Sequence, residues 1–459
     1  MPMLDCLITN ARIVDPEGGG DFYGSLGIRG GKIALIREGP ESGTGGESGA
    51  KRILDARGCL LVPGFIDIHA HTDSSVPCAE KLLSMGVTTA VSGNCGLSPV
   101  DFPAFFRAFE ARPYPINQAE QAGHTELRRA AGQGDVRAPA SADQITRMKG
   151  LVQDALDAGA AGLSFGLEYV PGASPQEVLE LASLAGRAGR PVSIHTRVNG
   201  YNDTASLREA LDLSVKTGGR VIISHLVYMY TGEELKRAAE VIDGYRDAGA
   251  DVWVDSGMYT AFASFAGTPL FDEKTFFGRD FSFEKLRAAT GKYAGQFLNM
   301  EKYKEMRNCF PNDSFIYDHG TPEDICAAYA LADVMVSTDC IAYPDGQGHP
   351  QGAATYPFFL RTMVKERKQL SLVEGLRRCS FLPAEAMGYL GKGRIKTGAD
   401  ADLAILDWDR LRERADFPGL GNPGAAPEGI THVFVNGVLA LEKEERIPGV
   451  FAGKCLYAG

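Results

Sequence analysis

Long apolar runs are missing from this sequence of 459 residues, and no stretch approaches the roughly 18 residues that a membrane-spanning helix needs. Positive charge is also in short supply: 47 Lys and Arg residues stand against 58 Asp and Glu residues, for a formal net charge of −11. This balance disfavours nucleic acid and anionic membranes as partners. No G-x-x-x-x-G-K-[ST] motif occurs and no G-x-G-x-x-G opens a helix after a strand, so nucleotide binding has no support.

Cysteine is present but follows no pairing pattern. The nine cysteines are odd in number and scattered, and the N-terminus shows no basic-then-apolar leader. We therefore expect a reduced, cytoplasmic protein without a disulfide framework. A hydrophobic content of 44% is ordinary for a globular chain, and the length allows a large core plus a second module. No feature of the sequence sets an oligomeric state.

Both ends of the chain carry short strand patterns. Residues 7–14 and 24–36 alternate between turns, and similar material returns at 431–438. Chain ends often meet in space. We therefore expect one small β-sandwich that is built from residues 1–62 and 391–459.

Between these ends, strands alternate with helices. One helix is predicted at 144–158 and another from Ser174 onward. Buried strand candidates lie at 65–68, 86–93, 162–166, 191–194, 220–224, 251–255 and 334–337. The alternation predicts an α/β fold, a TIM-like (β/α)8 barrel over residues 63–390. The interval at about 257–331 is too long for a simple connection and predicts an inserted subdomain or lid.

Two histidines follow the first barrel strand. A Pro63-Gly64 turn leads into the apolar run 65–68, and His69 and His71 stand at its end with one residue between them. Alternate side chains of a strand face the same side, so both imidazoles can reach one point. Two nitrogen ligands on one face form half of a metal site. A lone H-x-H is also common among structural histidines.

Polar side chains end the other strands as well. Cys95 follows the second strand, His195 and His225 end two later strands, and Asp339 follows the last. Each of these residues alone also fits a buried structural role. Catalytic groups of such barrels come from the C-terminal ends of the strands. Because all of them occupy that position, the pattern predicts a metal site.

The sequence resembles the D-aminoacylase branch, the N-acyl-D-amino-acid deacylases, of the amidohydrolase superfamily. The resemblance extends over nearly the whole chain, and its most specific part is Gly93-Asn94-Cys95-Gly96. It also includes the segments 63–71, 123–129, 162–167, 398–403 and 429–437. The family implies a (β/α)8 barrel with a β-sandwich formed from both termini, which agrees with the pattern above.

The resemblance also implies one or two zinc ions. Cys95, His195 and His225 would hold the tighter ion, and the Cys95 thiolate would bridge toward a second position formed by His69 and His71. Many relatives bridge with a carbamylated lysine of the fourth strand, but residues 162–167 contain no lysine. The thiolate therefore supplies the negative ligand here, and sulfur with imidazoles suits Zn²⁺.

Asp339 is the predicted general base and acid. Zinc lowers the pKa of a bound water to about 7 and polarises the carbonyl of the substrate amide. Asp339 would accept the proton as water attacks that carbonyl, and would then hand it to the leaving nitrogen. Cys95 is consumed as a ligand, so an acyl-enzyme on this cysteine is not expected.

Substrate recognition departs from the family pattern. A lysine is expected two residues after His225, where the chain has Val227, and an arginine is expected after His349-Pro350, where it has Gln351. Either Arg197 or Arg361 substitutes, or the substrate lacks the carboxylate, since a carboxylate is costly to bury without a cation. The candidate substrate-binding residues are Arg197, Tyr259 and Gln351. Aromatic and apolar residues around Tyr259 line an acyl or aryl pocket or pack the barrel against the insert.

Three hypotheses remain. The first two are enzymes that act on a small-molecule substrate, and the third is a protein without catalytic activity. The first is a zinc amidohydrolase that cleaves the amide bond of an N-acyl-D-amino acid or related N-acyl compound. The second is a hydrolase of a cyclic amide, imide or lactone, which would explain the missing carboxylate clamp. The third is a barrel that has lost catalysis and acts as a structural or partner-binding subunit. A structural hydrogen bond is the favoured role of His124, in the family-like segment 123–129, over orienting that loop or the substrate.

Overall fold

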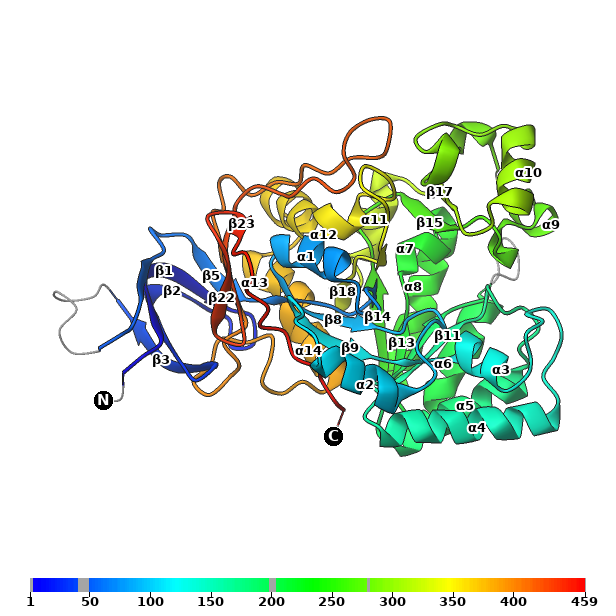
Figure 1. Cartoon of the computed structure of the whole chain (residues 1–459), viewed down its shortest axis with the longest axis horizontal. Coiled ribbons are helices and arrows are strands. Elements are labelled where there is room, and N and C mark those ends of the chain that lie inside the picture. Colours follow the sequence, from blue (N-terminus) through cyan, green and yellow to red (C-terminus); the bar gives the residue numbers. More distant parts are fainter. Residues whose placement is uncertain (1–2, 40–48, 198–203, 279–280, 459) are drawn as a thin grey trace.

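The computed structural model describes residues 3–39, 49–197, 204–278 and 281–458. Both ends of the chain contribute to one nine-stranded sheet within these residues, drawn in blue and red in Figure 1. The N-terminal part supplies β1 (Cys6–Asp15), β2 (Gly20–Arg29), β3 (Lys32–Glu38), β4 (Ile53–Asp55) and β5 (Leu60–Pro63). The C-terminal part supplies β20 (Leu403–Leu406), β21 (Ile430–Val435), β22 (Val438–Glu442) and β23 (Glu445–Arg446). Antiparallel pairing of β20 with β5 joins the two parts.

Parallel strands form the centre of the molecule. Three of them pair in the order β6 (Phe65–Asp67), β8 (Val87–Ser92) and β9 (Asn117–Glu120). Six more pair in the order β10 (Ala122–Gly123), β11 (Leu163–Gly166), β12 (Val192–His195), β13 (Val221–Ile223), β14 (Val252–Ser256) and β18 (Val334–Val336). Beyond β6 and β18 the chain forms β7 (Ala70–His71) and β19 (Cys340–Ile341), which pair in parallel with each other.

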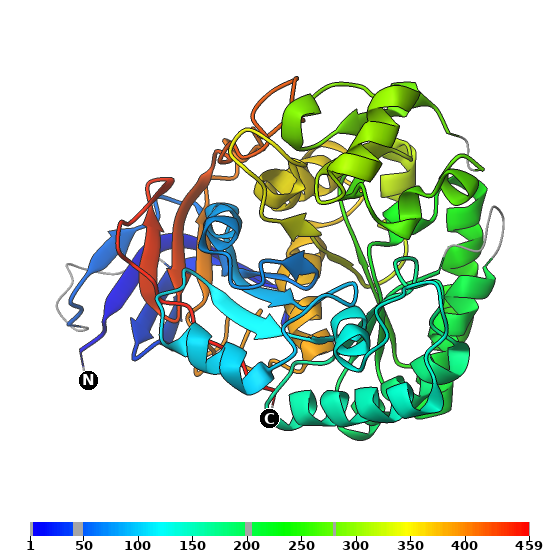
Figure 2. The same cartoon turned by 45° about the vertical axis from the view of Figure 1, so that its right-hand side comes forward.

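Helices connect these strands and lie outside them, as Figure 2 shows most clearly for the green segments. Their bounds are α1 (Val76–Ser84), α2 (Phe102–Glu110), α3 (His124–Ala130), α4 (Ala142–Asp157), α5 (Pro175–Arg187), α6 (Ala205–Thr217), α7 (Leu226–Met229), α8 (Gly232–Asp247), α11 (Pro322–Ala328), α12 (Gln351–Phe359), α13 (Leu372–Leu376) and α14 (Leu382–Met387). The helix predicted from Gln144 begins two residues earlier, because Ser141 and Gln144 form a capping box. None of the helices within the described residues combines the length and the apolar character needed to cross a bilayer.

A separate unit lies between β14 and β18. Its strands β15 (Ala261–Phe265), β16 (Leu286–Ala288) and β17 (Ser314–Asp318) form an antiparallel sheet, which is accompanied by α9 (Glu273–Phe276) and α10 (Met300–Cys309). Aromatic rings fill it: Phe271 packs edge-to-face on Phe276 and Phe315 with centroids 4.9 and 5.0 Å apart. The unit projects from one end of the central strands in Figure 1. It therefore overhangs the strand ends without joining the central sheet.

Candidate metal centre

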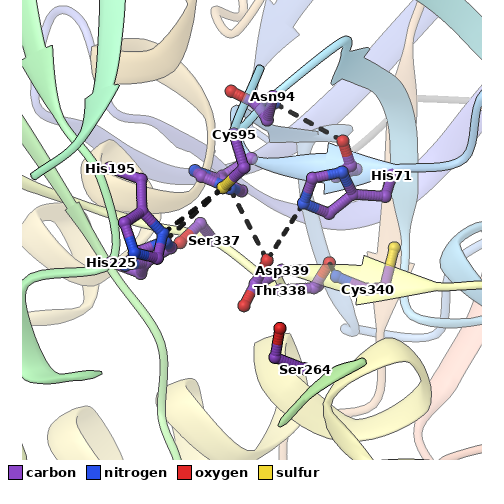
Figure 3. Close-up of polar contacts among 12 residues, drawn as sticks. His71, Asn94, Cys95, His195, His225, Ser264, Ser337, Thr338, Asp339 and Cys340 are labelled. Carbon is purple, nitrogen blue, oxygen red and sulfur yellow. Dashed lines mark hydrogen bonds and ion pairs between the residues drawn. The ribbon is translucent and has the colours of Figure 1, made fainter. Parts of the chain in front are cut away.

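Six side chains of the predicted site come together at the C-terminal ends of the parallel strands. His195 is the last residue of β12, His225 lies two residues beyond β13, and Cys95 lies three residues beyond β8. His69 and His71 come from the β6–β7 segment, and Asp339 precedes β19. Figure 3 shows the labelled members pointing into one shared space.

The sequence predicts that His69 and His71 lie on one continuous strand. In the structure that strand is interrupted before His69. The structure ends β6 at Asp67 and begins β7 at Ala70, because β6 pairs with β8 whereas β7 pairs with β19. The two rings lie 5.5 Å apart with their planes tilted by 68°. Both imidazoles nevertheless reach one point, because the Nε2 atoms of His69 and His71 both lie close to Asp339 Oδ1.

A tight turn presents the Cys95 sulfur. Cys95 adopts a left-handed backbone with φ of 52°, between Gly93 at 75° and Gly96 at 82°. A Cβ on Gly93 would stand 2.1 Å from the carbonyl oxygen of Gln121, so this position requires glycine. Non-glycine residues in this region cluster at functional sites. His225 and Asp339 share the conformation, with φ of 36° and 51°.

The side chains form two groups that share Cys95. In the first, Cys95 Sγ lies 3.7 Å from His195 Nδ1 and 3.7 Å from His225 Nε2. In the second, Cys95 Sγ lies 3.3 Å from His69 Nε2, and Asp339 Oδ1 lies 3.2 Å from His71 Nε2 and 3.5 Å from His69 Nε2. Within each group the donor atoms all lie within 4.8 Å of one another, so each group could hold a metal ion.

Electrostatics favour ionised acids in this cluster. Burial raises the pKa of the Cys95 thiol, but the charge of His69 and hydrogen bonds from His195 and His225 outweigh it and hold the pKa well below its usual range. Burial likewise raises the pKa of Asp339, yet the hydrogen bond from His71 and the other two histidines nearby lower it overall. The site therefore contains a thiolate and a carboxylate, the forms that bind metal ions and accept protons.

Two carboxylates that the sequence interpretation missed support the histidines. Glu168 Oε2 lies 2.9 Å from His195 Nε2, on the ring nitrogen opposite the one that faces Cys95. Asp255 Oδ2 lies 3.4 Å from His69 Nδ1, and Asp255 Oδ1 accepts the backbone N–H of His225. Asp255 could have been found, because it ends a predicted strand. Glu168 lies two residues beyond β11, the same offset as His225 from β13, so its strand-end position could have pointed to it as well.

A pocket of about 310 Å³ opens at this cluster. His71, Cys95 and Asp339 contribute to its wall. The rest of the wall comes from the α3 region, the insert and the segments after β8, β11 and β18: Leu97, Thr125, Arg129, Val136, Arg137, Tyr169, Ala263, Ser264, Phe265, Gly267, Thr268, Pro269, Ser314, Ile341 and Tyr343. Ser264 lies beside Asp339 in Figure 3, and its hydroxyl donates to the Tyr169 hydroxyl.

The three candidate substrate-binding residues lie elsewhere. Arg197 lines a different pocket and binds Glu209 and the carbonyl oxygen of Ala173. Tyr259 packs edge-to-face against His349 at 4.8 Å. The Gln351 amide donates to the backbone oxygen of Asp339 and accepts from the Tyr228 hydroxyl, so it braces the site from behind. Their role in substrate binding stays a prediction.

His124 makes the structural contact that the sequence favours. Its Nε2 lies 2.8 Å from Glu177 Oε1, and both side chains are fully buried. Glu177 Oε1 also accepts from Arg128 Nε at 3.0 Å. Burial lowers the pKa of His124 despite the carboxylate beside it. The ring lies outside both metal-capable groups.

Comparison with known proteins identifies relatives of similar length. The model of the amidohydrolase family matches residues 60–440. An N-acyl-D-glutamate deacylase from Alcaligenes xylosoxydans xylosoxydans is 31% identical, over 95% of this chain and 93% of its own length.

Solved structures extend the likeness to the fold. The N-acyl-D-glutamate deacylase of Bordetella bronchiseptica, complexed with zinc and a phosphonate mimic of the tetrahedral intermediate, superposes with a TM-score of 0.86. It is 28% identical, with 99% of this chain and 100% of that one covered. A D-aminoacylase described as having a binuclear metal centre gives a TM-score of 0.85 at 25% identity, with the same coverage.

Proposed function

The chain belongs to the amidohydrolase family, and from that premise we propose that it is a zinc-dependent deacylase that hydrolyses the amide bond of N-acyl-D-amino acids or related N-acyl compounds. The convergence of Cys95 with four histidines and Asp339 in one cluster is the observation that carries the proposal. Its deacylase relatives act on substrates of this class by their names. The same relatives do not favour the cyclic-amide alternative.

Zinc fits the donor atoms present. Tetrahedral Zn²⁺ with Zn–N of about 2.0 Å and Zn–S of about 2.3 Å separates the nitrogen and sulfur ligands by about 3.5 Å. The three imidazole nitrogens around Cys95 Sγ stand at 3.3, 3.7 and 3.7 Å. Cys95, His195 and His225 would hold one ion, and His69 and His71 a second that shares the thiolate. The proposal includes one or two ions.

Asp339 is the proposed general base and acid. Bound zinc supplies a Lewis acid that activates water and polarises the substrate carbonyl. The pKa of Asp339 is lowered overall despite burial, and its carboxylate faces the pocket, so it can accept the proton of the attacking water. The same oxygen then delivers that proton to the leaving nitrogen. Its backbone is braced on both sides, by the N–H bond to His69 O at 2.8 Å and by the Gln351 amide.

The proposal also concerns architecture and location. Pairing of β7 with β19 and the order of the parallel ladders support a closed (β/α)8 barrel. We propose domain limits at 1–62, 63–390 and 391–459, with the insert at about 257–331. A cytoplasmic location, suggested by the scattered cysteines, stays a prediction.

Replacement of Asp339 by asparagine tests the mechanism. We expect Asp339→Asn to retain zinc, because the metal-facing imidazoles and thiolate remain, while turnover falls by roughly 10²- to 10⁴-fold. Zinc content and turnover are measured on a panel of N-acyl-D-amino acids, their L-isomers, neutral acylamines and cyclic amides. Wild-type turnover of the cyclic amides alone would favour the ring-opening alternative. Unchanged turnover in the variant would remove Asp339 from the mechanism.

A further inference from the structure

We propose that Arg129 and Arg137 form a subsite that binds a carboxylate of the substrate. This inference rests on the proposed deacylase function and assigns the group that meets the negative charge of an N-acyl-amino acid. Among the described residues that line the pocket at the metal-capable cluster, these two supply the arginine side chains, and no lysine joins them. His71, also in the wall, is already paired with Asp339.

The rest of the pocket cannot balance a carboxylate. Apart from His71, Cys95, Asp339 and the zinc that would meet the amide, its wall is made of apolar side chains, backbone and a few hydroxyl groups such as those of Tyr169, Ser264 and Thr268. A carboxylate transferred into such surroundings without a cation loses its hydration at large cost. Arg129 and Arg137, whose side chains are 60% and 55% exposed, are the cationic side chains that this pocket offers to the carboxylate of an N-acyl-amino acid.

A buried arginine holds the segment that carries this subsite. Arg128 is 1% exposed, and its Nε donates to Glu177 while its Nη1 donates to the backbone oxygen of Asp135 at 2.8 Å. Its Nη2 donates to the backbone oxygen of Ala138. The carbonyls of Asp135 and Ala138 flank Arg137 in the loop after α3, so the clamp fixes the backbone on both sides of it.

A second contact fixes the same loop from the strand side. The backbone N–H of Gly172 donates to the Val136 oxygen at 2.8 Å. The loop is therefore ordered before any ligand arrives, which lowers the entropy cost of binding. The segment 123–129 therefore has a structural role. Its His124 and Arg128 both bind Glu177 of α5, and these contacts support the part of the pocket wall that carries Arg129 and Arg137.

Both guanidinium groups retain donors for a second carboxylate. Arg129 Nη1 binds Glu126 at 2.6 Å, and Arg137 binds Asp272 of the insert through Nη2. A guanidinium carries five N–H donors, so each pair leaves several in the fork that suits a carboxylate. By contrast, Arg197 uses Nε and Nη2 on Glu209 and Ala173, and Arg361 uses Nε and Nη2 on Glu413. Neither of these lines the pocket.

The test compares substrates that differ in one charge. Zinc-loaded wild type and the double variant Arg129→Gln/Arg137→Gln are assayed with the N-acetyl-D-amino acid that wild type hydrolyses fastest and with its carboxamide. We expect KM for the acid to rise on the order of ten- to a hundredfold in the variant, the loss typical of charge-assisted hydrogen bonds, while KM for the carboxamide stays at the wild-type value. An N-succinyl-D-amino acid carboxamide carries its only carboxylate on the acyl group. Its KM in wild type and in the double variant shows whether the arginines bind a carboxylate of the acyl group or of the amino acid.

Two controls separate binding from support of the loop. Asp272→Asn removes the partner of Arg137 but keeps the guanidinium, and it should keep the preference for the acid. Arg412→Gln removes an exposed arginine of similar type, paired with Glu428 and outside the pocket, and should change neither KM. Thermal unfolding of all variants confirms that they are folded.

The outcomes distinguish the subsite from the proposed function. If the double variant keeps the wild-type ratio of KM values for acid and carboxamide, the subsite is wrong and the deacylase function stands. The same holds if Asp272→Asn alone reproduces the loss. If zinc-loaded wild type hydrolyses no N-acyl compound, the proposed function fails, and the subsite with it.

Discussion

Two buried histidine–carboxylate pairs in this molecule use the same residue types for different ends. His195 and Glu168 meet at 2.9 Å beside the metal-capable cluster, and His124 and Glu177 meet at 2.8 Å beneath the loop after α3. Burial lowers the pKa of both rings. Around His195 the Cys95 thiolate and Glu168 reverse this effect and raise the pKa to about 9, whereas around His124 the charge of Arg128 opposes Glu177 and the pKa stays lowered.

The role of each histidine–carboxylate pair therefore depends on the charged group beside it, which is Cys95 for His195 and Arg128 for His124. The second nitrogen of His195 faces the Cys95 sulfur at 3.7 Å, so a carboxylate that holds the far side aims a lone pair at a metal position. The second nitrogen of His124 has no hydrogen-bond partner among the described residues. Glu177 also binds Arg128. Arg128 in turn donates to the backbone oxygens of Asp135 and Ala138, so this pair fixes the loop after α3.

Removal of Cys95 is the largest change that can be made to this comparison. Cys95→Ala deprives His195 of its distinguishing neighbour and removes the ligand common to both metal-capable groups. We expect loss of zinc and of turnover, beyond the ~10- to 100-fold cost of losing an outer partner of a metal ligand. Metal analysis of the purified variant measures it. Full zinc content would show that the thiolate is not a ligand.

Zinc affinity should also separate the two carboxylates from each other. Glu168→Gln weakens the contact that orients His195, and we expect zinc affinity to fall roughly 10- to 100-fold. Glu177→Gln serves as the matched control, since it alters the same kind of contact away from the cluster, and should leave the affinity unchanged. Competition with a chelator gives both values. Equal zinc affinities in the two variants would show that Glu168 does not orient His195 for metal binding.

Stability should respond in the opposite order. Glu177→Gln leaves the buried Arg128 guanidinium without its carboxylate, and we expect a loss of about 3 kcal/mol in the free energy of unfolding, as for other broken buried pairs. Glu168→Gln, measured without metal, should cost less, because the contact it weakens is with a histidine, which can lose its proton, and not with a permanently charged guanidinium. Denaturant unfolding gives both values. A stability of Glu177→Gln equal to that of wild type would contradict this role of Glu177.

The smallest expected effects concern pH. A ring whose pKa is lowered on folding, as for His124, contributes stability that is present above its unfolded value of 6.5 and is lost as the pH falls. A ring whose pKa is raised, as for His195 without metal, contributes stability below 6.5 that is lost as the pH rises toward 9. Each proton is worth at most about 1.4 kcal/mol per pH unit.

Unfolding of chelator-treated protein between pH 5.5 and 9 measures these slopes. Compared with wild type, His124→Asn should lose less stability on acidification, and His195→Asn should lose less on alkalinisation. If both variants changed the pH dependence of the free energy of unfolding in the same direction relative to wild type, the opposite pKa shifts of His124 and His195 would be contradicted.

The convergence of the candidate metal ligands was predictable because each of these residues stands where a strand ends. His195 ends β12, and Cys95 and His225 follow β8 and β13 within three residues. Parallel strands bring these C-terminal ends to one edge. Glu168 also follows a strand end, but the local sequence does not distinguish an acid that contacts a histidine there from one exposed to solvent. The predicted (β/α) alternation and the meeting of the two termini also appear as ladders in the structure.

The arginines show where prediction from sequence stops. Arg128 and Arg129 are neighbours on one helix, yet Arg128 is 1% exposed while the side chain of Arg129 is 60% exposed. The sequence contains no sign of this difference, because it depends on Glu177, which arrives from α5, nearly fifty residues later. Helical periodicity places the two on different faces but does not say which face meets a carboxylate.

The sequence by itself determined the succession of strands and helices and the residues that stand at strand ends, since both follow from local periodicity and turn chemistry. Tertiary structure alone decided which carboxylate reaches which histidine, which arginine is buried and which faces the pocket. Those choices are made between groups far apart along the chain. In the protein interior, a charged group with a partner at about 3 Å can stay ionised, whereas the same group without a partner destabilises the fold.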